Sequence, residues 1–576
     1  MLKQDDRTLP SGSGGDGQVG LFDSVLARSQ SQEILFAESP SRVGLQTLDL
    51  PSRPLGQYCA NVWRNQNFET FEGLLKPFLN YAQLELEFRV HGYDDTLDFT
   101  LWEPAEVEIL WLDSSRYTDR MAFEDWQGWL RSRLLDLRSR STAPILVASW
   151  DAWRGDVGVR SLDALVNGVP GAYVADLGAA CHGEGVTLLD PRVAKVSGSP
   201  ISRSAQMVLA RWLGCRWLPG LLLPPIKAVA VDLDNTLHAG VLGEDGVVGV
   251  QLESGHKALQ SALWALKARG VFLALVSRNE REDVEALFTQ RPDYPLCWDD
   301  FSAIEVSWGS KVDALHRVAQ QLRIALNAVL FIDDNLGELA SVAAGCPEVH
   351  ILLASPEGTQ TYRALQYYPG LWRWSVSADD AHRIQDMKAN AERDRLARVV
   401  GDTGQYFQEL GITLALRYDA AADLPRLAEL CRKTNQFNLA LRRYNEADLA
   451  AFMARNDASV VAVSLSDRLS NSGTIAVLVA VREQDVLVVE ELCISCRALG
   501  RQLEDTIVLA SLRGVMLFEG CRQVRFNITE GSRNRPARDW FSRLMDRFGG
   551  LHRDGEVQAE WIAHFSPPSG VMFVQE

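Results

Sequence analysis

The stretch VDLDNTLHAGVLGEDG, from Val231 to Gly246, decides the fold of the middle of this chain. It completes IKAVAVD, a largely apolar run without polar alternation, which is typical of a strand buried on both faces of a parallel sheet. Asp232 and Asp234 stand where that strand is expected to end. Because ligands bind beyond the carboxyl ends of strands in open parallel sheets, these two carboxylates indicate a chemical site.

The sequence around this stretch repeats the same alternation from Lys227 to about Ala354. Apolar strands such as VFLALVS and AVLFIDD are separated by helical segments such as HKALQSALWALKARG and KVDALHRVAQQLRIAL. Buried strands between helices imply a parallel sheet that helices cover on both faces. We therefore expect an α/β, Rossmann-like core over residues 227–376.

Polar side chains follow three of these expected strands, and one more opens a helix. They are Asp232 and Asp234 after the first strand, Ser277, Arg278 and Asn279 after the second, Asp333 and Asp334 after the third, and Lys311 at the helix start. Any one of these aspartates alone is as well explained by a turn or a helix cap. Their joint occurrence in this order favours a catalytic site.

Crowded aspartates at one sheet edge raise one another's pKa, and a divalent cation removes that conflict. Carboxylate oxygens suit Mg²⁺, which binds one or two carboxylates together with water and substrate phosphate. The sequence therefore predicts Mg²⁺ as the cofactor. The predicted ligands are Asp232, Asp234, Asp333 and Asp334.

The expected chemistry at this edge is phosphoryl transfer. Asp232 is the predicted nucleophile, and Asp234 the predicted acid and base that protonates the leaving oxygen and then activates water. Ser277 and Lys311 would hold the oxygens of the transferred group. Further predicted substrate contacts in this region are Asn235, Thr236, Arg278 and Asn279.

The chain of 576 residues is long enough for about three domains of ordinary size. The expected division is a disordered tail at 1–42, an α/β domain at 43–220, the core at 227–376, a helical connector at 377–405 and a further α/β domain at 406–576.

The composition of the chain excludes some classes of partner and location. A net charge of −17 disfavours nucleic acid, and no apolar run approaches the ~18 residues of a membrane span. The N-terminal segment lacks the pattern of an export signal, and the nine cysteines are scattered, so we expect a soluble cytoplasmic protein.

The four motif segments resemble those of the haloacid dehalogenase superfamily, and the flanking sequence resembles its FkbH-like subgroup. The resemblance rests on GVLGEDG, SWGSKVDAL, FIDDN, CRKTNQFNLALRRY and ISCRALGR, and covers about Lys227 to Asp546. It implies an acetyltransferase-like C-terminal domain, and the N-terminal domain resembles a hydrolase fold of the SGNH type. No Gly-Asp-Ser block opens that domain near Asn67, so we expect a noncatalytic docking role for it.

The same resemblance implies a function. FkbH-like proteins take the glyceryl group of 1,3-bisphosphoglycerate, release phosphate and load the glyceryl group onto the phosphopantetheine arm of an acyl carrier protein in polyketide or related natural-product biosynthesis. Two alternatives stay open. One is a small-molecule phosphatase without acyl transfer, and the other is a binding module that has lost catalysis.

The segment CRALGRQLED, from Cys496, is expected to link a strand to a helix whose backbone N–H groups hold the phosphate of a pantetheine arm. The predicted contacts there are Arg497, Gly500 and Arg501, with Asn435 either binding substrate or capping a helix. His238 either contacts substrate or has a structural role. Cys493 and Cys496 are expected to be unreactive thiols.

Overall fold

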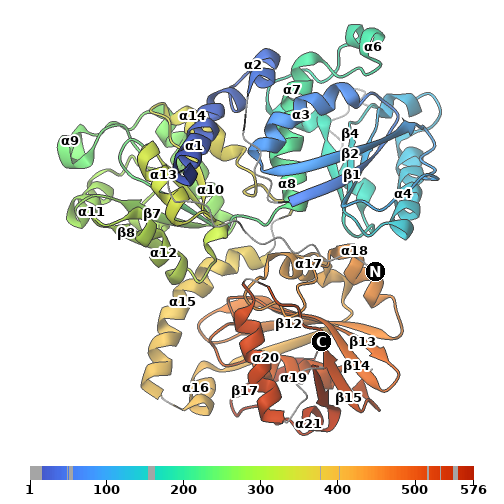
Figure 1. Ribbon diagram of the computed structural model, residues 1–576, viewed down its shortest axis with the longest axis vertical. Coiled ribbons are helices and arrows are strands. Elements are labelled where there is room, and N and C mark those ends of the chain that lie inside the picture. Colours follow the sequence, from blue (N-terminus) through green and yellow to red (C-terminus); the bar gives the residue numbers. More distant parts are fainter. Residues whose placement is uncertain are drawn as a thin grey trace.

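The computed structural model describes residues 16–48, 50, 56–153, 162–375, 378–400, 402–515, 518–531, 533–548 and 555–575. These residues form three units, each built around one β-sheet from a continuous part of the chain. Figure 1 shows the first two units side by side and the third below them. The α/β fold class is confirmed. The domain bounds and the likenesses to hydrolases and acetyltransferases stay predictions.

The first unit is a five-stranded parallel sheet in the order β2-β1-β3-β4-β5. Its strands are β1 (Gly56–Arg64), β2 (Leu84–Tyr93), β3 (Val107–Trp111), β4 (Ile145–Ser149) and β5 (Ala172–Asp176). Its helices are α3 (Glu69–Tyr81), α4 (Phe123–Arg140), α5 (Leu177–Gly183), α6 (Pro191–Ser197), α7 (Arg203–Trp212) and α8 (Leu218–Leu222). Helix α4 buries Trp126, Leu130, Leu134 and Leu137, which the helical period places on one face toward β3 and β4.

The second unit is a five-stranded parallel sheet in the order β10-β9-β6-β7-β8. Its strands are β6 (Ala228–Val231), β7 (Phe272–Ser277), β8 (Ala303–Val306), β9 (Val329–Asp333) and β10 (His350–Leu353). Its helices are α9 (Leu242–Gly249), α10 (Ser254–Ala268), α11 (Arg281–Gln290), α12 (Lys311–Gln321), α13 (Leu336–Gly345) and α14 (Gly358–Gln366). The central strands β6, β7 and β9 are buried throughout, as their apolar sequences predict.

The third unit is a seven-stranded mixed sheet in the order β16-β15-β14-β13-β12-β11-β17. Its strands are β11 (Ile412–Tyr418), β12 (Ala458–Ser466), β13 (Asn471–Glu483), β14 (Val486–Ile494), β15 (Gln523–Phe526), β16 (Glu556–Gln558) and β17 (Val571–Gln575). Its helices are α16 (Thr403–Leu410), α17 (Leu424–Lys433), α18 (Glu446–Met453), α19 (Glu504–Gly514), α20 (Arg535–Phe548) and α21 (Ala559–Ala563). Strands β11 to β14 pair antiparallel with one another, so short hairpin connections suffice between β12, β13 and β14, whereas β17 pairs parallel with β11 and β15 parallel with β14.

The predicted disordered tail at 1–42 is wrong over residues 16–42, which include helix α1 (Asp16–Leu35) and the start of α2 (Arg42–Thr47). Leu35 and Phe36 are buried in a hydrophobic core that the first and second units share. Gln32 pairs with the edge strand β10: its side-chain nitrogen donates to the Leu353 carbonyl at 3.0 Å, and its oxygen accepts from the Leu353 N–H at 3.2 Å. The helix thus covers a sheet edge that would otherwise leave backbone groups unpaired. Residues 1–15 lie outside the described part.

Helix α15 (Ala378–Val400) joins the second unit to the third (Figure 1). It contacts both, because Arg383 donates to the Gly270 carbonyl beside β7 while Arg393 forms an ion pair with Asp467 beyond β12. None of the described helices is long and apolar enough to cross a membrane.

Candidate active site

The register of the second sheet brings the predicted residues together at its carboxyl edge. Val231 lies opposite Leu275 of β7 and Ile332 of β9, and the Asp232 N–H donates to the Ile332 carbonyl at 2.9 Å. Asp232 therefore lies between the carboxyl ends of β7 and β9, the strands that end in Ser277 and Asp333. Helix α12, on the same edge, begins at the buried Lys311.

Three carboxylates and one ammonium form the centre of the site. Carboxylate oxygens of Asp232, Asp333 and Asp334 lie within 4.8 Å of one another. The Lys311 Nζ lies 2.9 Å from Asp232 Oδ2 and 2.5 Å from Asp333 Oδ2. Asp333 is fully buried, and Asp232 is only 6% exposed. The cluster thus carries more negative charge than its lysine neutralises.

The residues present fit a divalent cation. Asp232 Oδ1 is buried and accepts no hydrogen bond from any described residue. Burial, then repulsion from Asp232, raises the pKa of Asp333 to about 7 despite the attraction of Lys311. Burial also raises the pKa values of Asp232 and Asp334. An unsatisfied oxygen among crowded carboxylates is the environment that an ion such as Mg²⁺ would complete, and Asp232, Asp333 and Asp334 would hold it.

The Asp234 side chain lies outside the group of three carboxylates that could hold a metal ion, and its oxygens have other partners. Its Oδ1 accepts from the Leu242 N–H at 2.9 Å and lies 3.3 Å from His238 Nε2, while Oδ2 accepts from Asn279 Nδ2 at 2.8 Å. Burial acts to raise the pKa of Asp234, but these hydrogen bonds outweigh it and lower that pKa. An ionised Asp234 suits the base half of its predicted role.

His238 holds Asp234 in place. The ring is fully buried, with Nε2 toward Asp234 and Nδ1 3.0 Å from the Tyr294 hydroxyl. Of the two roles considered from the sequence, the structural one is found. Its signal in the sequence is the spacing of four residues from Asp234. Tyr294, which the sequence analysis missed, belongs to no motif and meets His238 only through the fold.

The end of β7 contributes the hydrogen-bonded pair Ser277 and Asn279, together with Arg278 at the border of the site. Ser277 is 3% exposed, and its Oγ accepts from Asn279 Nδ2 at 3.1 Å, so Asn279 bridges Ser277 and Asp234. Arg278 is half-exposed and forms an ion pair of 2.9 Å with Glu338 at the start of α13. It therefore borders the site and is not aimed at its centre.

The two remaining predicted substrate contacts, Asn235 and Thr236, lie in the turn after Asp234. Asn235 has a positive φ of 51°, and its side-chain oxygen accepts from the Gly240 N–H at 3.0 Å. Short polar side chains such as asparagine tolerate this left-handed conformation better than most. Thr236 is buried, and its hydroxyl has no hydrogen-bond partner among the described residues.

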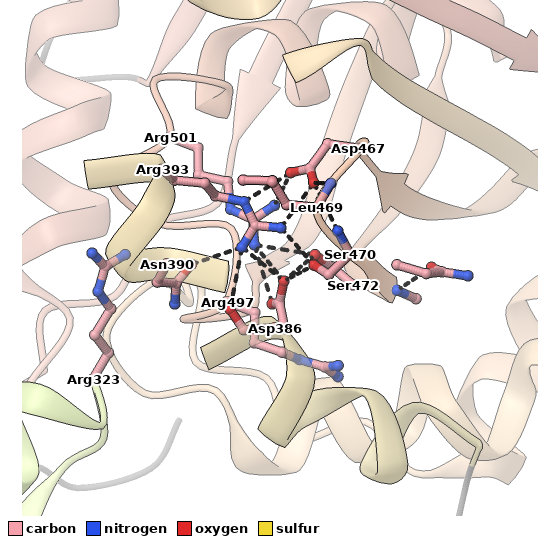
Figure 2. Close-up of polar contacts among 12 residues, drawn as sticks. Arg323, Asp386, Asn390, Arg393, Asp467, Leu469, Ser470, Ser472, Arg497 and Arg501 are labelled. Carbon is pink, nitrogen blue, oxygen red and sulfur yellow. Dashed lines mark hydrogen bonds and ion pairs between the residues drawn. The ribbon is translucent and has the colours of Figure 1, made fainter. Parts of the chain in front are cut away.

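Arg501 does not form the predicted phosphate site, because its charge is already committed. Its guanidinium lies 2.9 Å from Asp386 and 3.4 Å from Asp467, and Arg393 binds the same two carboxylates. Figure 2 shows the two arginines facing Asp386 and Asp467, with Ser470 among them. Two arginines balance two aspartates in a buried cluster, so Arg501 joins α15 to the third sheet.

The other predicted contacts of the third unit are not brought to Asp232. The Gly500 N–H donates to Glu504 at 3.2 Å, and the Asn435 side-chain oxygen accepts from Arg443 at 2.7 Å. Asn435 and Arg497 line a pocket that also includes Lys227, the residue before β6. Asp232 follows β6, so this pocket lies at the opposite edge of the second sheet. The structure thus places Asn435 and Arg497 away from Asp232, and their predicted ligand contacts stay predictions.

Comparison with known proteins gave structural similarities only. No family model matches the sequence, and neither does any curated protein. The N-terminal part of the protein BF1531 from Bacteroides fragilis, containing a phosphatase domain complexed with Mg, is 18% identical, with a TM-score of 0.44, over 59% of this chain and 99% of that one. The 3-deoxy-D-manno-octulosonate 8-phosphate phosphatase from Moraxella catarrhalis, in complex with magnesium, phosphate and KDO, is 23% identical, with a TM-score of 0.17, over 31% of this chain and 92% of that one. At these values the chemistry of the site rests on its own residues.

Proposed function

We propose that this chain is a Mg²⁺-dependent enzyme of the haloacid dehalogenase type that removes phosphate from a small phosphorylated metabolite. The observation that carries the proposal is the buried Asp232, with one oxygen held by Lys311 and the other without a described partner, beside two further carboxylates. Nucleophile, cation ligands and a positive group for phosphoryl oxygens thus meet at one sheet edge.

The geometry supports a two-step hydrolysis. An Asp232 oxygen attacks phosphorus, and an aspartyl-phosphate bond forms as the bond to the leaving oxygen breaks. Asp234, protonated at this step, gives its proton to the leaving oxygen and is left ionised. Water then attacks phosphorus and gives a proton to the ionised Asp234, while the bond between Asp232 and phosphorus breaks and phosphate is released. Bound Mg²⁺ would offset the repulsion between carboxylate and phosphate. Lys311 and Ser277 hold the phosphoryl oxygens.

We further propose 1,3-bisphosphoglycerate as the substrate and an acyl carrier protein as the acceptor, in polyketide or related biosynthesis. This substrate has two phosphates of different chemistry. Asp232 would hydrolyse the phosphate ester at carbon 3, while the thiol of the phosphopantetheine arm attacks the carbonyl at carbon 1 and expels phosphate, which leaves a glyceryl thioester. Support for this finer proposal comes from the resemblance of the segments around Asp232, Lys311, Cys431 and Ile494 to FkbH-like proteins.

A phosphatase without acyl transfer is the second candidate. The observation that favours it is the position of Asn435 and Arg497 at the sheet edge opposite to Asp232, where they do not contact a substrate bound at Asp232.

The test incubates the full chain with Mg²⁺, freshly generated 1,3-bisphosphoglycerate and a phosphopantetheinylated carrier protein. Phosphate release and the intact mass of the carrier are both measured. We expect release, a glyceryl mass increment, and a loss of release by at least ~10⁴-fold in Asp232→Asn, because an amide is not a nucleophile. The matched control is Asp125→Asn, on the exposed side of α4.

The outcomes separate the proposals. Release without the mass increment supports the phosphatase alone. Normal release by Asp232→Asn would sink both, provided that its unfolding midpoint matches that of the wild type.

A further inference from the structure

A pocket rich in positive charge lies where the second unit, helix α15 and the third unit meet. Its walls include the residue before β6, the first residue of β7, the segment between α12 and β9, two turns of α15, and the segments around α17 and the end of β14. Six cationic side chains line it: Lys227, Arg323, Arg383, Arg426, Lys433 and Arg497. Two acidic ones accompany them, Asp386 and Glu429. The excess is positive although the chain as a whole carries a net charge of −17.

The two carboxylates of this pocket are already neutralised. Glu429 accepts from Arg426 at 2.7 Å and from Lys433, both within α17. Asp386 is paired with Arg393 and Arg501, neither of which lines the pocket. Glu429 also attracts Lys227 and Arg383, and Arg323 forms an ion pair of 2.8 Å with Asp394 outside the pocket. The walls still carry six cationic side chains against two acidic ones.

Two of the cationic side chains, those of Lys227 and Arg497, are largely buried. No described carboxylate forms an ion pair with Lys227, which lies at the amino edge of the sheet. Burial lowers the pKa of its ammonium, and the attraction of the nearby Glu429 does not outweigh it. Arg497 is only 8% exposed, so its guanidinium is largely removed from water. Cations that are desolvated in this way bind anions more strongly than cations on an open surface.

We propose that this pocket binds the phosphate group of an anionic ligand, at a site separate from the one at Asp232. Four residues of β6 lie between Lys227 and Asp232, which corresponds to roughly 16 Å along an extended strand. A phosphate held at Lys227 is therefore out of reach of the nucleophile. The pocket binds phosphate without hydrolysing it, and its occupation links the second and third units.

Two sources share this chemistry, a free phosphorylated metabolite and the phosphopantetheine arm of a carrier protein. Binding of either ligand can be followed at Cys496, which lines the pocket and is half-buried. The experiment measures the alkylation rate of Cys496 in the full chain without Mg²⁺ by peptide mass spectrometry. Inorganic phosphate, coenzyme A and unphosphorylated pantetheine are the probes. The exposed Cys297 serves as the internal control.

We expect phosphate and coenzyme A to slow Cys496 alkylation at least threefold and saturably, with Cys297 unaffected and pantetheine without effect. In Lys227→Gln the half-saturating concentration should rise about tenfold, because one charge–phosphate contact is lost. Lys257→Gln, on the exposed face of α10, is the matched control and should behave as the wild type.

The relative potency identifies the source. Coenzyme A acting at far lower concentration than phosphate indicates a carrier arm, and similar potency indicates a free metabolite. Two results would overturn the proposal: no saturable protection by phosphate or coenzyme A, or unchanged half-saturation in a Lys227→Gln variant of normal unfolding midpoint. Because Asp232 takes no part, the outcome is independent of the proposed hydrolysis.

Discussion

Two buried clusters of charged side chains differ in their balance. At the carboxyl edge of the second sheet, Lys311 forms ion pairs with two of three clustered carboxylates, and Asp232 Oδ1 has no described partner. Between α15 and the third sheet, Asp386 and Asp467 face Arg393 and Arg501 in equal number (Figure 2). Both oxygens of Asp386 accept hydrogen bonds. The balanced cluster is a structural joint, and the unbalanced one is a site that a cation completes.

The pKa values of the two clusters shift in opposite directions. Burial dominates at Asp333 and raises its pKa to about 7. Burial also acts on Asp386, but the charges of Arg501 and Arg393 and the hydroxyls of Ser470 and Ser472 together lower its pKa. A buried carboxylate with a raised pKa thus marks missing positive charge, whereas a lowered pKa marks charge that is present.

The largest expected effect comes from breaking the balanced cluster with Arg393→Met. Its removal leaves buried carboxylates short of one positive charge, which should lower the free energy of unfolding by about 3–5 kcal/mol. Arg395→Met is the matched control, because Arg395 lies on the same helix, is 72% exposed at its side chain and pairs with Glu392 on the surface. Urea titration measures both variants. Equal stability of the two would contradict a structural role for the cluster.

The next effect comes from removing the lone cation of the unbalanced cluster with Lys311→Met. Phosphate release should fall about 10²–10³-fold, because the group that holds Asp232 and the phosphoryl oxygens is lost. Lys257→Met is the surface control. Steady-state phosphate release at saturating Mg²⁺ measures the change, and activity within threefold of the wild type would refute the role of Lys311.

The smallest effect is the response of the two clusters to pH. The folded Mg²⁺-free protein keeps a proton on Asp333 up to about pH 7, whereas the unfolded chain loses it near pH 4, so raising the pH between these values should destabilise the apo protein. Mg²⁺ competes with that proton, so its half-saturating concentration should rise up to tenfold for each pH unit below 7. Differential scanning fluorimetry against pH and Mg²⁺ measures both trends, and Asp333→Asn should flatten them.

Asp386 should respond in the opposite sense. Its folded pKa is lowered, so its stabilising effect is present above the ordinary value of 3.8 and is lost as the pH falls through the folded pKa. Acid unfolding below about pH 4 should therefore report on the balanced cluster. A stability profile without this acid limb would contradict the assignment.

The active-site edge could be predicted from sequence because each of its residues directly follows a buried strand or opens a helix. The convergence of Asp232, Ser277 and Asp333 follows from the rule that the carboxyl ends of parallel strands lie at one edge of the sheet. The partner of Arg501 could not be found this way, because Asp386 lies 115 residues away and meets it only through packing of α15. Helix α1 was missed for the same reason, since its Gln32 is ordered by Leu353 of a distant strand. The position of Asp234 at this edge was predicted correctly. Its hydrogen-bond donors could not be predicted, because the turn that follows brings the Leu242 N–H to its carboxylate.

Calorimetric titration of Mg²⁺ into the metal-free protein at pH 7.5 tests the central claim most directly. We expect one Mg²⁺ per chain, with affinity reduced at least ~10-fold in Asp334→Asn and unchanged in Asp125→Asn. Absence of binding in the millimolar range, or equal affinity in Asp334→Asn and wild type, would contradict the assignment of the three carboxylates to a cation.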